Sequence, residues 1–422
     1  MTNRFSKPEA IKKALFTTSV LNFIARCAGY LKNISIAALL GFNYQTDAYF
    51  FAAGIIAIFN IFSGTVYSVG IPWLTRAGQK NKQAFASSAA QLLGFNLLIC
   101  AAISLIASIA LPIVSMSFLR EVRPVFSAIL WILFPMIILN FLFTYFSTVL
   151  RSQRLFTIQT AADFFNSFSQ FVLITAGLFI YKTIWVLPWA LLISLILAVL
   201  WQLFFVFRHL RPDFRLDKQF KSLLGQFLVF AALGATASLY AVIDKAFASY
   251  LPEKAISALV YGLLISQLPQ GIINLNNMFF TAISEKPNWP TLNKFICIAL
   301  AISVPYAALL FAIPDILVEL ILGYGLFGGA DLAYTATAVR YYALALPSFY
   351  LNSFFNNVLV VKKIFGGLFA LSVSNIILNI AANYVFLFRL KMDLTGLVLA
   401  TVIVSYITLV AQWLLTAKKV KL

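Results

Sequence analysis

Long apolar runs constrain this chain more than any other feature of its sequence. Stretches of roughly 20 or more mainly apolar residues recur from one end to the other, separated by short polar connections, and a helix of that length crosses the hydrocarbon core of a bilayer. Only 10% of the 422 residues are charged, whereas a soluble domain carries about 25%. The sequence therefore predicts an all-α polytopic membrane protein.

The apolar runs predict about twelve transmembrane helices in two lobes of six. The predicted spans are 14–40, 48–74, 85–113, 125–150, 156–181, 184–207, 222–243, 256–283, 293–318, 334–360, 364–388 and 394–416. The basic segment 208–221 would link an N-terminal lobe, 1–207, to a C-terminal lobe, 222–422. Many transporters are built from two such repeats, with the substrate site between them.

The lysines and arginines indicate the orientation of the chain. Most of them lie in alternate connections on the same side as both termini, and few lie on the other side. Because cytoplasmic loops carry an excess of Lys and Arg, both termini are expected to be cytoplasmic in a bacterial inner membrane. The net charge of +18 then follows from topology and does not require a nucleic-acid partner.

The first predicted span carries charges that a lipid-facing helix would not tolerate. Arg26, Lys32 and Asn33 lie within its apolar run. A charge at the bilayer centre costs about 2.5–3.5 kcal/mol, so two cations in one span favour a water-filled cavity that they face. Lys32 lies about 100° around the helix from Asn33, so both cations face one space only if the cavity is wide or the helix bends.

Polar residues at helical spacing in other spans also favour a hydrated cavity. The expected lining residues are Asn22, Gln159, Asn166, Gln170, Gln267, Gln270, Asn274, Asn277, Asn375 and Asn379. For any single amide, a hydrogen bond between helices is the simpler explanation. Several whole stripes are more than helix packing requires.

Three charged residues can be explained without a role in the cavity. Arg340 either faces the cavity or extends to the outer interface, since it lies near the start of its span. Asp163 either takes part in function or pairs with Arg151 or Arg154 near the end of its span. Asp244 lies at an outer span end, where most charges are simple interface residues.

The chain shows no catalytic or metal-binding motif. It has one histidine, in a basic connection, three cysteines, all within predicted spans, and no phosphate-binding loop. We therefore expect no enzyme, no metal site and no cofactor. Intramembrane cations point to an anionic cargo or head group, moved at the expense of a gradient or the membrane potential.

Several stretches resemble one family of membrane transporters. ARCAGYLKNISIAALLGFNYQTDAYFFA, residues 25–52, resembles the opening hairpin of the MurJ/MviN lipid II flippases of the MOP exporter superfamily. The matching positions are Arg26, Gly29, Lys32, Gly41 and the run Thr46-Asp47-Ala48-Tyr49-Phe50. Residues 243–271 are similar to the hairpin of helices seven and eight in that family, and residues 313–347 to its ninth and tenth helices.

The resemblance implies two six-helix lobes around a central cationic cavity that works by alternating access. The cargo would be a sugar linked to a polyprenyl pyrophosphate. Separately from the resemblance, we expect a monomer in contact with membrane lipids, with envelope-synthesis enzymes as partners. Arg26 and Lys32, with Asn33 and Arg340, would contact the substrate. Asp47 would be a gating or coupling residue, and Asp163 and Asp244 are further candidates for that role.

The chain departs from the family pattern at several points, which keeps alternatives open. The second helix has Asn60 and no cation, and Leu264 stands where the eighth helix is expected to carry an arginine. Lipid II flippases typically have fourteen helices, so a surface-polysaccharide unit is an alternative cargo. A cation-coupled drug antiporter and a non-transporting scaffold are alternative functions.

Overall fold

The computed structural model describes residues 11–116, 122–207, 211–215, 218–269, 289–362 and 364–419. These residues form helices and short connections, and no β-strand occurs among them. By their contacts, the helices divide into two compact units: Met1–Leu39 with Ala52–Ala235, here called unit 1, and Leu40–Phe51 with Thr236–Leu422, called unit 2. These boundaries differ from the expected lobes, and six helices per lobe stays a prediction.

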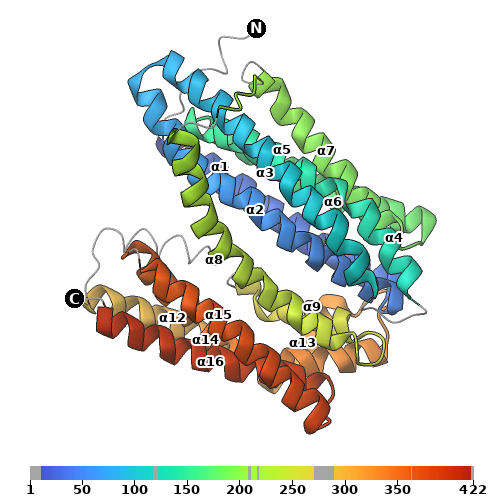
Figure 1. The fold of residues 1–422 in the computed structure, drawn as a ribbon. Helices are drawn as coiled ribbons and strands as arrows, with labels where there is room; N and C mark the ends of the chain where they lie inside the picture. Colours follow the sequence, from blue (N-terminus) through green and yellow to red (C-terminus); the bar gives the residue numbers. More distant parts are fainter. Residues whose placement is uncertain are drawn as a thin grey trace. The chain divides into compact units, whose positions relative to one another are not determined.

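Unit 1 is built mainly from the first half of the chain (Figure 1). Its helices are α1 (Ile11–Leu40), α2 (Tyr44–Lys80), α3 (Lys82–Met116), α4 (Arg123–Leu133), α5 (Pro135–Ser152), α6 (Phe156–Tyr181), α7 (Val186–Val206) and the first part of α8 (Lys218–Ala248). Helix α7 packs against α4, α5 and α6, and α3 packs against α5. Buried hydrogen bonds join these helices, such as that from Gln202 to Ser147 between α7 and α5.

Unit 2 is arranged around one long helix, α14 (Gly329–Val361). It packs against α9 (Ala255–Ser266), α12 (Trp289–Ala312), α13 (Pro314–Leu322) and α16 (Leu394–Lys419), while α15 (Phe365–Tyr384) packs against α16. A π-helical turn, η2 (Val385–Arg389), follows α15. The stretch Leu40–Phe51 comprises the end of α1, the connection and the first turns of α2, and it belongs to this unit. The tip of the first hairpin is therefore part of a different unit from the rest of the hairpin.

The helices bear out the expected fold class, although two predicted spans are interrupted. Ten stretches in the described residues are long and apolar enough to cross a membrane, and shorter apolar helical stretches lie at 220–232 and 255–266. The predicted spans 125–150 and 293–318 are each divided into two helices. In each pair the first helix ends just before a proline, and the second begins at that proline, Pro135 or Pro314. Proline has no N–H to continue the helical ladder, which accounts for both interruptions. The count of twelve stays a prediction.

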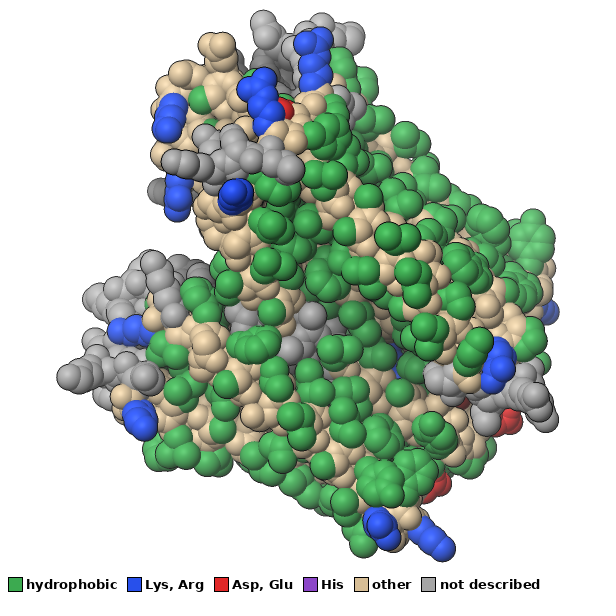
Figure 2. Space-filling view, viewed as in Figure 1, with side chains coloured by type: hydrophobic (Ala, Val, Ile, Leu, Met, Phe, Trp, Pro, Cys, Tyr) green, Lys and Arg blue, Asp and Glu red, His purple; other side chains and the backbone are tan. Residues whose placement is uncertain are grey.

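The surface matches a lipid environment. Hydrophobic side chains cover most of the surface in view, and most Lys and Arg side chains in view lie near its edges (Figure 2). On α3, Leu105, Ile109 and Ile113 are each more than 60% exposed and follow one another at a spacing of four residues. Such a stripe would be unfavourable in water, whereas it is ordinary on a face that contacts hydrocarbon.

Helix α9 crosses α14 so closely that only a glycine fits at the contact. A Cβ atom built at Gly262 would lie 2.6 Å from Cβ of Ala338. We expect Gly262→Val to lower the thermal midpoint by several degrees, since overpacking a buried contact costs about 1–3 kcal/mol. The control is Gly366→Ala on α15, where an added Cβ meets no described atom within 4 Å. Equal midpoints for the two variants in detergent would contradict this packing.

Candidate functional site

Helices α1 and α6 share a polar face within unit 1. Lys32 Nζ on α1 donates to Oε1 of Gln170 on α6 over 3.0 Å, and Gln170 in turn donates to Asn166 over 3.1 Å. One turn further along, Thr175 donates to Ser35 over 2.9 Å. Within the described residues Lys32 forms no ion pair, so its partner is a neutral amide. A neutral partner leaves the positive charge of Lys32 uncompensated.

The α1 helix borders open space beside its cations. A Cβ atom built at Gly29 would meet no described atom within 4 Å. Gly29 lies three residues from both Arg26 and Lys32, and therefore about one helical turn from each. Arg26 and Asn33 are half-buried, and Asn22 is exposed. This part of α1 thus has open space at Gly29, on the helix that carries both cations.

At the far end of the same α6 face, Asp163 is held by a neighbouring amide. Gln159 donates to Asp163 Oδ2 over 2.6 Å, and Gln159 is itself buried. Arg151 instead donates to the Tyr67 hydroxyl and lies over the Tyr67 ring, 5.6 Å from its centre. No salt bridge joins Asp163 to Arg151 or Arg154 in the described residues. Asp163 is thus hydrogen-bonded within its own helix.

Asp47 caps a helix that lies two hundred residues further along the chain. The buried carboxylate of Asp47 accepts the backbone N–H groups of Lys254 at 2.7 Å and Ser257 at 2.8 Å, and the hydroxyl of Ser257. These groups form the N-terminus of α9, whose own N-cap residue provides no side-chain acceptor. Free N–H groups and the positive end of the helix dipole both favour a carboxylate there. The α1–α2 hairpin tip is therefore fixed to α9.

The connection before α9 is further held by an ion pair. Lys254 adopts a left-handed backbone conformation, with φ of 84°, and its Nζ lies 2.8 Å from Oδ1 of Asp331 at the start of α14. The hydrogen bond from Lys254 to Asp331 raises the pKa of Lys254 above its ordinary value. Gly41, at φ of 63°, completes the close packing of the hairpin tip, because a Cβ atom built there would lie only 3.1 Å from the carbonyl oxygen of Leu326.

Asp244 forms the centre of a second buried polar cluster in unit 2. Its carboxylate accepts hydrogen bonds from Asn379 at 3.0 Å, Asn383 at 2.8 Å and Thr401 at 2.9 Å. The donors come from α15 and α16, and all are neutral. In the described part of the chain, the hydrogen-bond donors to Asp244 are thus all neutral. The next residue, Lys245, donates to the carbonyl of Phe50 over 3.2 Å.

Some of the other residues expected at the site are described by the structure, and some lie outside the described residues. Arg340 lies 3.1 Å from Asp315 in an ion pair whose side chains are 44% and 57% exposed, which matches the interpretation of an outer interface residue better than that of a substrate contact. Asn375 accepts from Thr408 between α15 and α16, and Gln267 follows the end of α9. Gln270, Asn274 and Asn277 lie outside the described residues.

Two residues of these clusters, Ser257 and Thr401, were not among the sequence-based candidates. Ser257, Thr401 and Asn383 supply hydrogen bonds to the two buried carboxylates. Asn383 continues the spacing of Asn375 and Asn379, so that stripe contains a usable signal. Isolated Ser and Thr residues in apolar helices have no such pattern, because they commonly bond their own helix backbone.

The fold belongs to a known class of transporters. The structure resembles a lipid II flippase MurJ in an inward closed conformation, with a TM-score of 0.80 over 95% of this chain and 87% of that one at 19% identity. It also resembles an inward-facing multidrug resistance transporter of the MATE family, from the MOP superfamily, with a TM-score of 0.75 over 95% of this chain and 97% of that one at 14% identity. At these identities the two matches show a shared fold.

Sequence comparison identifies the family. The family model for the lipid II flippase MurJ matches residues 36–422, and the chain belongs to this family. A probable lipid II flippase MurJ of Buchnera aphidicola from Acyrthosiphon pisum is 27% identical over 360 residues, which are 80% of this chain and 70% of that protein. A probable lipid II flippase MurJ from Aquifex aeolicus is 25% identical over 83% of this chain and 72% of that protein. The chain is a multi-pass inner-membrane transporter and not an enzyme, as its sequence predicts.

The Asp47 cap can be tested by hydrogen exchange. We expect Asp47→Asn to speed exchange of the amides of residues 254–257 and to lower the thermal midpoint, since a charge-assisted hydrogen bond contributes about 1.5–3 kcal/mol. Asp315→Asn removes the same charge from an exposed ion pair and serves as the control. Unchanged exchange at residues 254–257 in Asp47→Asn would show that the carboxylate does not hold α9.

Proposed function

We propose that this protein translocates a lipid II-like precursor, a sugar linked to a polyprenyl pyrophosphate, outward across the inner membrane by alternating access. The observation that carries the proposal is the basic face of α1 in unit 1, where Lys32 has a neutral partner and Gly29 borders open space. The carrier acts as a monomer with both termini in the cytoplasm. The pyrophosphate would bind to Arg26 and Lys32, and its attached sugar to the amides of α6.

The chemistry of this face suits a pyrophosphate. Phosphate oxygens accept charge-assisted hydrogen bonds from Arg and Lys, which are stronger than neutral ones. Gln170 positions the Lys32 ammonium group without neutralising it, so the cation remains available to an anionic group. Asn166 and Gln170 offer amide donors and acceptors of the kind that hydroxyl-rich sugars bind. Asn33 lies on the same helix face as Arg26 and would extend the contact.

The two buried carboxylates of unit 2 would serve movement and not cargo binding. Asp47 is the candidate gating residue, because release of the hairpin tip from α9 would break the three hydrogen bonds to its carboxylate. Asp244, surrounded by neutral donors, is the candidate for ion coupling. An inside-negative potential also assists, since each negative charge carried outward gains about 2.3 kcal/mol per 100 mV.

A drug antiporter is the runner-up because the fold also matches a MATE transporter. Exporters of cationic drugs need an acidic binding face to stabilise their substrates. The polar face of α1 and α6 contains Arg26 and Lys32, and the acid on α6, Asp163, is hydrogen-bonded to Gln159 at the end of that face. The charge of the face thus favours an anionic cargo.

The cargo itself is tested with purified protein in vesicles. Flipping would be measured for lipid II, for a surface-polysaccharide repeat on the same polyprenyl pyrophosphate, and for a cationic drug, while lipids that co-purify are identified by mass spectrometry. We expect lipid II to be moved fastest. Faster movement of the polysaccharide unit would reassign the cargo, movement of the drug alone would reassign the class, and no movement of any of the three would favour a scaffold.

Arg26→Ala is expected to lower lipid II flipping about tenfold or more, because a charge-assisted contact with the pyrophosphate is lost. The thermal midpoint should stay near that of the parent protein, since the side chain is only half-buried. Lys82→Ala, which removes one exposed positive charge from the start of α3, is the control and should flip normally. Full flipping by Arg26→Ala would remove Arg26 from the substrate contacts.

Gly29 allows the open space to be tested separately from the charges. Gly29→Leu should block flipping while the protein folds normally, because the new side chain enters space that no described atom occupies. Gly29→Ala is the matched control: it should keep most of the activity and gain up to about 1 kcal/mol from better helix propensity. Normal flipping by Gly29→Leu would show that this space does not carry the cargo.

A further inference from the structure

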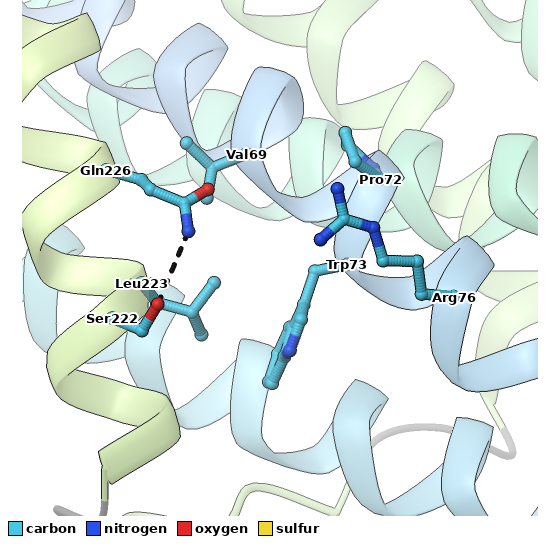
Figure 3. A pocket seen from close by; sticks show the side chains of 7 residues that line it. All are labelled: Val69, Pro72, Trp73, Arg76, Ser222, Leu223 and Gln226. Carbon is cyan, nitrogen blue, oxygen red and sulfur yellow. Dashed lines mark hydrogen bonds between the residues drawn. The ribbon is translucent and has the colours of Figure 1, made fainter.

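A second polar pocket in unit 1 lies apart from the α1–α6 face, where the end of α2 meets the start of α8. Its volume is about 130 Å³, several times the roughly 30 Å³ per molecule of liquid water. Trp73, Arg76, Ser222 and Gln226 supply its polar wall, and Val69 and Leu223 its buried apolar floor. The guanidinium group of Arg76 and the amide of Gln226 point into the same space, with Trp73 beside them (Figure 3).

The polar groups of this pocket are suited to an anion. Arg76 brings a fixed positive charge, and Gln226, Ser222 and the Trp73 indole can each donate a hydrogen bond. No Asp or Glu lines the pocket in the described part of the chain. Lys80, at the end of α2, and Lys221, in the first turn of α8, are both exposed and add to the positive potential. A phosphate group fits this set of donors better than a neutral or cationic ligand.

The pocket lies where phospholipid headgroups are found. Helix α2 has 37 residues and a length of about 55 Å, which exceeds the roughly 30 Å hydrocarbon core, so one of its ends must reach the headgroup region. The end that carries Trp73, Arg76 and Lys80 has the composition of such an interface, with an indole and basic residues. Basic pockets between transmembrane helices on the cytoplasmic side commonly hold anionic lipid headgroups.

Both helices change from polar to apolar in the same direction away from the pocket. Phe62 on α2 contacts Phe227 on α8, and Ile61 lies against Gly234, so the two helices run antiparallel. On α8, Ser222 and Gln226 are followed on the same face by Val229, which is 46% exposed. On α2, Arg76 and Trp73 are followed in the opposite chain direction by Val69, which is buried, so the exposed apolar surface beside the pocket is that of α8. This order matches a lipid, with its headgroup in the pocket and its acyl chains along the helices.

We propose that this pocket binds the phosphate-bearing headgroup of an anionic phospholipid. The bound lipid holds the first turns of α8 against α2. The site is separate from the cargo face, so the proposal does not depend on which precursor the protein moves. It also makes a membrane lipid a specific ligand of unit 1 and not only a solvent around it.

The test uses the full-length protein in nanodiscs of phosphatidylcholine with a minor fraction of phosphatidylglycerol. Native mass spectrometry after release would count the phosphatidylglycerol molecules retained. We expect Arg76→Gln to retain about fivefold less than the parent protein, since one basic residue near the headgroups contributes a factor of that size. Lys80→Gln removes the same charge outside the pocket, so its loss of retained phosphatidylglycerol should be clearly smaller than that of Arg76→Gln.

Two further measurements distinguish lipid binding in the pocket from non-specific attraction of anionic lipids to basic residues. Gln226→Leu keeps the charge but removes a donor, and should also reduce retained phosphatidylglycerol, with a thermal midpoint in lipid-free detergent like that of the parent protein. Equal retention by Arg76→Gln and Lys80→Gln, or no preference for phosphatidylglycerol in the parent protein, would overturn the proposal. Stabilisation by inorganic phosphate but not by phosphatidylglycerol would reassign the pocket to a free anion. Flipping of lipid II is measured separately and bears only on the cargo.

Discussion

A charge within an apolar helix must find a partner or water, and this requirement organises the described structure. Burying an ion without compensation costs several kcal/mol even after the protein relaxes. Asp47 meets the requirement with the free amides of α9, and Asp244 with three neutral donors. Arg340 meets it by reaching an exposed ion pair with Asp315. Each solution ties distant segments of the chain together.

Lys32 meets the requirement in a different way. Its ammonium group is bound to a neutral amide, and the helix beside it borders open space at Gly29. The Asp47 carboxylate is enclosed by donors, and its charge is used to hold two parts of unit 2 together. The positive charge of Lys32 therefore has a neutral partner, whereas the Asp47 carboxylate is used within the protein itself. This difference separates groups suited to cargo binding from groups suited to conformational control.

The fold class follows from the sequence because apolar length is a direct physical signal. A run of roughly 20 apolar residues has few alternatives to a membrane-spanning helix. The breaks before Pro135 and Pro314 were less visible, since proline is tolerated inside many transmembrane helices, as Pro72 and Pro112 show here. The fold class was thus predictable, but which prolines end a helix depends on its neighbours.

The candidate site was only partly predictable, because the sequence does not show which group will form hydrogen bonds with a buried charge. Periodicity placed Asn166 and Gln170 on one helix face, and the structure joins that face to Lys32. Periodicity cannot say which element will satisfy a single charge. Asp47 finds its donors in the backbone of α9, and backbone amides carry no side-chain signature. A helix N-terminus offers the same amides whatever residues form it, so partners of this kind become visible only when the chain is folded.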